Sequence, residues 1–179
     1  MDAIVVYESV FGNTRAIAEA VAEGLGSVLV LPVHEAAKRD VTVDLLVVGG
    51  PTHMHGLSTT RSRRLAAEGS REDGAGHVEP SATKEPGMRS WLRELPPTVA
   101  ARAAAFDTRL DKSPWLTGVA ARGIARRLRR HGLEVVATES FVVEDSEGPL
   151  EEGELDRARA WGRELARLLT APTGDLVGA

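Results

Sequence analysis

The chain has 179 residues, of which 42% are hydrophobic and 27% charged, as expected for an ordinary globular domain with a substantial core. Its net charge of −4 disfavours general nucleic-acid binding, because such binding requires a basic surface. Cysteine is absent, which excludes disulfides, thiol nucleophiles and cysteine-ligated clusters within the chain and fits a reducing compartment. No stretch has the pattern of a signal peptide or the length of a membrane span, so we expect a cytoplasmic location and no membrane contact.

The first 25 residues predict a strand, a turn and a helix in direct succession. Residues 3–7 are an apolar run, typical of a strand that is buried on both faces. Residues 14–25 have a helical pattern, with Ile17, Val21 and Leu25 four apart on one face and charged residues four apart on another. One face of this helix is therefore expected to pack against the strand while the other meets water.

The turn at residues 9–14 has the composition of an anion-binding site. Ser9, Asn13 and Thr14 supply side-chain donors beside a helix N-terminus, whose dipole favours negative charge. No Lys or Arg lies within the turn, so a phosphate would be held mostly by neutral donors. Gly12 is its only glycine, and a Gly-Lys-Ser/Thr ending is missing, which excludes a dinucleotide fingerprint and a P-loop. The alternative is an ordinary strand-turn-helix capped by Asn13 or Thr14.

Further apolar runs predict the remaining strands at residues 28–33, 45–48, 100–106 and 133–143. We expect Gly49-Gly50-Pro51 to end the third strand sharply. Helical patterns predict helices at residues 34–39, 59–68, 88–95 and 116–131. The last helix carries small and apolar residues three and four apart, at Leu155, Ala158, Gly162, Leu165 and Leu169.

The alternation of strands and helices predicts an α/β fold with a parallel sheet covered on both faces. Residues 1–170 are expected to form one domain, followed by a frayed tail at 171–179. Residues 57–87 form a long insertion after the third strand, and its part 69–86, rich in Gly, Glu, Ser and Pro, is predicted to be mobile. This insertion is either a lid over the site or a disordered segment.

The turn reads Ser9-Val10-Phe11-Gly12-Asn13-Thr14 and resembles the phosphate loop of the flavodoxin family, Ser/Thr-x-x-Gly-x-Thr, between the first strand and the first helix. By element order the resemblance covers residues 2–169, interrupted by the insertion. It implies a single-domain flavodoxin-like fold with a doubly wound five-stranded parallel sheet of order 2-1-3-4-5. The ligand crevice of such a sheet lies at the carboxyl ends of the first and third strands.

The resemblance also implies that the cofactor is FMN, with its phosphate at residues 9–14 and its ring between residues 51–56 and 107–115. Thr52, His53 and Met54 would contact one side of the ring, and residues 107–109 would contact its other edge. Ordinary flavodoxins flank the ring with aromatic residues from these two loops. Here the first loop offers His53, Met54 and His55, and the second loop has no aromatic residue before Trp115. The candidate cofactor-binding residues are Ser9, Val10, Phe11, Gly12, Asn13, Thr14, Pro51, Thr52, His53, Met54, His55, Gly56, Asp107, Thr108, Arg109 and Trp115.

Three functions are compatible with this resemblance. The first is an electron-transfer protein whose flavin cycles between oxidised, semiquinone and hydroquinone forms and serves redox partner proteins. The second is an FMN-dependent NAD(P)H quinone oxidoreductase of the same fold. The third is a binding module of this fold that has lost the cofactor, a reading favoured by the missing ring aromatics.

Other chemistries are less well supported by the sequence. His53 and His55 lack further ligands at a spacing suitable for zinc, and Ser9 lacks the Gly-x-Ser-x-Gly elbow of a hydrolase. Five acidic residues between 144 and 152 are expected to form a solvated turn. Arginines on one face of the helix at 116–131 could dock an acidic partner, although a solvated helix face is the expected reading: Arg122, Arg126, Arg129 and Arg130.

Overall fold

The structure is a computed structural model that describes residues 2–40, 42–53, 56–73, 78–96, 99–111, 119–145 and 147–170. Its centre is a sheet of five parallel strands in the order β2-β1-β3-β5-β6. Counted along the chain, this is the predicted order 2-1-3-4-5, so the predicted α/β fold is confirmed. The strands are β1 (Ala3–Tyr7), β2 (Leu29–Pro32), β3 (Val43–His53), β5 (Ala100–Leu110) and β6 (Glu134–Val143). A two-residue strand that was not predicted, β4 (Gly56–Leu57), pairs antiparallel with the end of β3.

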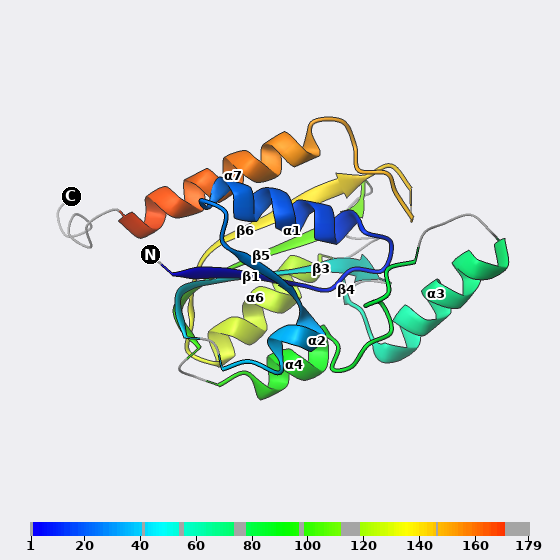
Figure 1. The fold of residues 1–179 in the computed structure, drawn as a ribbon, viewed down its shortest axis with the longest axis horizontal. Helices are drawn as coiled ribbons and strands as arrows, with labels where there is room; N and C mark the ends of the chain where they lie inside the picture. Colours follow the sequence, from blue (N-terminus) through cyan, green and yellow to red (C-terminus); the bar gives the residue numbers. More distant parts are fainter. Residues whose placement is uncertain are drawn as a thin grey trace.

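Helices cover both faces of the sheet (Figure 1). One face is covered by α1 (Asn13–Gly24) and α7 (Glu154–Thr170), which pack against each other. The opposite face is covered by α2 (Val33–Ala36), α4 (Met88–Glu94) and α6 (Ala120–Arg130). Helix α3 (Thr60–Asp73) lies at the periphery, next in sequence after β4.

Each face has its own apolar core. On the α1–α7 face, the rings of Phe106, Phe141 and Trp161 meet edge to face, with centroids 6.0–6.2 Å apart. On the other face, Met88, Leu92 and other apolar side chains of the helices pack on the sheet. Strand β1 contributes to both cores because its alternate side chains point to opposite faces, which explains its unbroken apolar run.

The prediction that Gly49-Gly50-Pro51 ends the third strand is wrong, because β3 continues to His53. Gly49 pairs with Tyr7 of β1 and Phe106 of β5, and a Cβ atom on Gly49 would lie 1.9 Å from Cζ of Phe106. The glycine therefore makes room for a core ring. Pro51 is tolerated because β1 ends at Tyr7, so that β3 lacks a parallel neighbour on that side.

Strand β5 is also longer than predicted and includes residues 107–110, which were expected to form a loop. Strand β6 extends to Val143 and pairs with this added part of β5, so its backbone groups are satisfied as strand. Helix α6 begins at Ala120, after the extended residue Val119, and residues 116–118 of the predicted helix lie outside the described residues. Leu155 was expected on the packed face of the last helix, but it is 38% exposed.

The insertion contains more regular structure than expected. Helix α3 continues to Asp73, beyond the predicted end at residue 68, and includes Gly69 at the modest cost that glycine has within a helix. Further along, Glu79 donates its backbone N–H to the carbonyl of Val10, so this part of the insertion contacts the loop at residues 9–14. The mobility of residues 69–86 stays a prediction. None of the helices in the described ranges is both long and apolar enough to span a bilayer.

Candidate functional site

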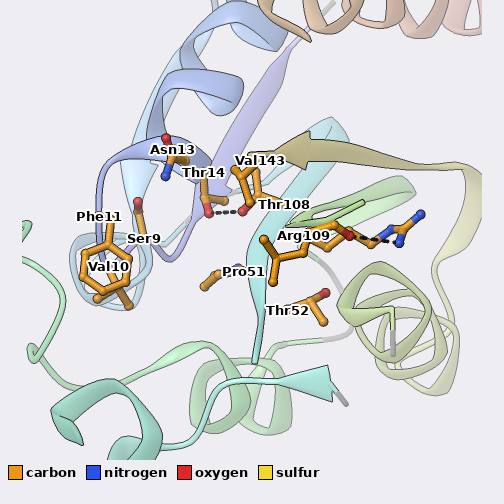
Figure 2. A pocket seen from close by; sticks show the side chains of 11 residues that line it. Ser9, Val10, Phe11, Asn13, Thr14, Pro51, Thr52, Thr108, Arg109 and Val143 are labelled. Atoms are coloured by element: carbon orange, nitrogen blue, oxygen red, sulfur yellow. Dashed lines mark hydrogen bonds between the residues drawn. The ribbon is translucent and has the colours of Figure 1, made fainter. Parts of the chain in front are cut away.

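A cleft of about 240 Å³ opens at the carboxyl edge of the sheet, where β1, β3, β5 and β6 end (Figure 2). Its walls come from the loop before α1 and from the ends of three strands, so segments more than 130 residues apart in sequence meet here. The residues that line it are Ser9, Val10, Phe11, Asn13, Thr14, Pro51, Thr52, Thr108, Arg109, Leu110 and Val143. Nine of the sixteen predicted cofactor-binding residues are among them. Gly12 is not, but it shapes the loop.

Gly12 sets the geometry of the loop at residues 9–14. Its φ of 92° lies in the left-handed region that favours glycine, and its N–H donates to Oγ of Ser9 at 3.1 Å. Helix α1 begins at the next residue, with no side-chain cap hydrogen bond and no acidic residue in its first turn. Asn13 and Thr14 are thus helical residues rather than caps, so the reading of an ordinary capped helix is wrong. The first amides of α1 and the helix dipole provide an anion-binding end.

Thr14 and Thr108 join the loop to strand β5. Their hydroxyl oxygens lie 2.7 Å apart, and both residues are buried. One hydroxyl donates to the other, which leaves one proton of the pair for a ligand in the cleft. Thr108 is predicted at the edge of a ring, and its hydroxyl lies beside the loop at residues 9–14. Asn13 is fixed as well, because its Nδ2 donates to the carbonyl of Glu147 at 2.9 Å.

Thr52 lines the cleft, whereas Asp107 lies beneath it and has no exposed surface. Oγ1 of Thr52 donates to Oδ2 of Asp107 at 2.7 Å and accepts from the N–H of Ala120 at 2.9 Å. The same Oδ2 accepts from the N–H of Ala121 at 3.0 Å. Asp107 therefore stabilises the N-terminus of α6, where a carboxylate is favourable, and does not line the described cleft.

The other predicted residues are distributed as follows. Arg109 contributes to the wall of the cleft, but Figure 2 shows its guanidinium group pointing away from Ser9 and Asn13. His53 is the last residue of β3 and pairs with Gly56 of β4, and its side chain lies outside the described part of the structure. Met54, His55 and Trp115 lie outside the described residues.

Sequence reasoning missed three residues at this site. Leu110 lines the cleft because β5 runs further than predicted, and Val143 lines it because the end of β6 pairs with this added part of β5. The third is Glu79 of the insertion, which is 8% exposed and packs beside Gly12: a Cβ atom on that glycine would lie 3.4 Å from Oε1 of Glu79. Oε2 of Glu79 lies 3.6 Å from Nη1 of Arg15. A buried carboxylate therefore sits behind the predicted phosphate loop, partly balanced by a cation of α1.

Comparison with known proteins identifies the fold. No protein-family model and no curated protein sequence matches the chain. Among solved structures, a flavodoxin from the domain Archaea is 19% identical with a TM-score of 0.55, covering 96% of this chain and 100% of that one. Oxidised flavodoxin 2 from Bacillus cereus is 16% identical with a TM-score of 0.59, covering 94% and 99%. General stress protein 14 from Treponema denticola, solved in complex with FMN, is 11% identical with a TM-score of 0.51, covering 95% and 100%.

The sheet order, the two helical layers and these likenesses define the class: the chain has the flavodoxin-like fold. At these identities the likeness concerns the fold.

Proposed function

We propose that this protein binds FMN in the cleft and acts in electron transfer. The observation that carries the proposal is the meeting of a hydroxyl-rich cleft with the uncapped N-terminus of α1. The described lining contains no carboxylate, so nothing in the cleft wall repels a phosphate directly. Neighbours of the same fold include a protein solved with FMN, which agrees with this choice of ligand.

The residues present fit the two chemically different ends of FMN. Ser9, the first amides of α1 and the Thr14–Thr108 hydroxyl pair suit a phosphate. Pro51, Leu110 and Val143 give apolar surface suited to a ring. The cleft of about 240 Å³ is smaller than sites that enclose a whole ligand, which are about 300–1,000 Å³. A flavin held here would keep part of its surface open to partners, and it would supply one- and two-electron transfer.

The flavin carried by the purified protein tests the proposal. We expect a yellow protein that releases FMN on heat denaturation. A colourless protein that takes up no FMN would support the reading of a cofactor-free binding module. Consumption of NAD(P)H with a quinone as acceptor would assign the protein to the oxidoreductases, whereas reduction and reoxidation only by redox proteins would assign it to the electron carriers. The cysteine-free composition fits the cytoplasmic location that we propose for either.

Replacing Glu79 by glutamine should raise the affinity for FMN. The carboxylate lies against the phosphate loop, and a like charge near a partly solvated anion costs on the order of 1 kcal/mol, so we expect about a fivefold lower Kd. Riboflavin, which lacks the phosphate, should bind wild type and variant equally. The measurement is a fluorescence titration with both flavins.

Glu19→Gln is the matched control, because Glu19 also pairs with Arg15, at 2.8 Å, but lies on the exposed face of α1. We expect it to change FMN affinity by less than the Glu79 variant does. An unchanged or weaker FMN affinity in Glu79→Gln would show that this carboxylate does not act on the bound anion.

A further inference from the structure

Helix α6 exposes a row of arginines, here called the arginine face: Arg122, Arg126, Arg129 and Arg130. Their spacing of four, three and one residues places them on neighbouring positions of the helix surface. The helix has a fifth arginine, Arg127, and no acidic residue. In a chain with a net charge of −4, this is a strong local excess of positive charge.

The arginine face has no counter-ion within the chain as far as the structure describes it. None of its members forms an ion pair among the described residues, whereas Arg15, Arg157 and Arg159 of other helices each pair with a carboxylate. Like charges four apart on a helix repel each other, so Arg122 and Arg126 destabilise α6 slightly. A helix face that only contacts water does not require several unpaired arginines next to one another.

The helix dipole explains only part of this pattern. Cations in the last turn, such as Arg129 and Arg130, are favourable because that end carries partial negative charge. Arg122 lies in the first turn, where a cation is unfavourable. The dipole therefore does not explain Arg122, and α6 has no acidic residue of its own that would pair with it.

The surface around the arginine face is hollowed on both sides of α6. On one side a hollow of about 480 Å³ is lined by all four arginines, by Ala125 and by Thr138 of β6. On the other side, Arg89 and Arg93 of α4 line a second hollow with Arg127, Arg130 and His131. Burial, followed by the charges of Arg89 and Arg130, lowers the pKa of Arg127, as expected inside a cationic cluster.

The size of this surface favours a macromolecule over a small anion. Residues 122–130 extend over about 12 Å along α6, since each residue adds about 1.5 Å, and α4 widens the charged area. The surface also adjoins the cleft, because Arg122 and Arg109 line one further hollow and Arg109 belongs to the cleft wall as well.

We propose that the arginine face docks a partner protein through a surface rich in Asp and Glu. Charge complementarity selects this partner, and the remaining surface of this acidic chain would repel it elsewhere. The docked protein would lie beside the open edge of the cleft. The docking surface does not depend on a bound flavin, so its test is independent of the test of the proposed function.

The test measures binding of a fluorescein-labelled 15-residue polyglutamate peptide by fluorescence anisotropy at 25 and 150 mM NaCl. The test variant is Arg126→Glu/Arg130→Glu. The matched control is Arg163→Glu/Arg167→Glu, which reverses two exposed arginines with the same spacing on α7, across the sheet. Arg126→Lys/Arg130→Lys keeps the charge, and FMN titration and thermal unfolding of each variant check that fold and cleft are intact.

We expect the peptide to bind wild type and to weaken at least tenfold at the higher salt. The test variant should weaken binding at least tenfold at low salt, the control less than twofold, and the lysine variant should stay within about threefold of wild type. Absent binding to wild type, or equal losses in the two charge reversals, would overturn the proposal. So would tighter binding of a 15-base-pair DNA duplex through the same arginines, because it would identify a nucleic-acid surface.

Discussion

Replacing Arg63 by alanine should lower the free energy of unfolding by about 3–5 kcal/mol, the range observed when one partner of a buried ion pair is removed. Arg63 of α3 is 2% exposed, and its guanidinium group donates to the carboxylate of Glu8, which is 5% exposed and directly follows β1. Its Nη2 also donates to Glu85 at 2.6 Å. Among the described residues, the substitution would leave the buried Glu8 with hydrogen bonds only from Ser58 and from the N–H of Met88. Chemical denaturation measures the change.

Arg64→Ala is the control, because Arg64 is exposed on the same helix. It should change stability by less than about 0.5 kcal/mol, as surface substitutions usually do. If Arg63→Ala were as mild as this control, the pair would be solvated in solution. The same variant also tests the insertion: with Arg63 lost, protease should cut between residues 69 and 86 sooner than in wild type.

Replacing Thr14 by alanine should weaken FMN binding by about 1–3 kcal/mol, or roughly 5- to 150-fold, the cost of losing a hydrogen bond to a charged group. Thr14 is buried at the first turn of α1, and its hydroxyl lies 2.7 Å from that of Thr108 at the cleft. Riboflavin should bind wild type and variant about equally, since it has no phosphate. Both affinities come from the same fluorescence titration.

Thr14→Ser is the matched control, because it keeps the hydroxyl and loses only a methyl group. It should retain FMN affinity within a few-fold of wild type. Thr108→Ala removes the other hydroxyl of the pair and should behave like Thr14→Ala. An FMN affinity that is unchanged in both alanine variants would place the phosphate somewhere else.

The fold could be predicted because its signals are local. The apolar run of β1 and the four-residue spacing of Ile17, Val21 and Leu25 are direct consequences of burial in a strand and a helix. The loop between them, residues 9–14, contains its side-chain hydrogen-bond donors within six consecutive residues. For the same reason the sequence alone assigns Ser9, Thr14 and Thr52 to one edge of the sheet.

The errors arose where a distant contact decides the local structure. Gly49 looks like a strand end, but the ring of Phe106, 57 positions later, requires it inside β3. In the sequence Asp107 has the pattern of a loop carboxylate, because its contact with the N–H of Ala121 at the start of α6 cannot be seen there. Glu79 reaches Gly12 through a stretch without periodicity, so no pattern in the sequence indicates that contact.

The proposed function requires that the loop at residues 9–14 binds the phosphate of a flavin. The most direct measurement compares the affinities of flavin-free protein for FMN and riboflavin in one fluorescence titration, with inorganic phosphate as competitor. We expect FMN to bind at least tenfold more tightly, about 1.4 kcal/mol, and phosphate to weaken FMN but not riboflavin. Equal affinities for the two flavins, or no binding of either, would contradict the claim.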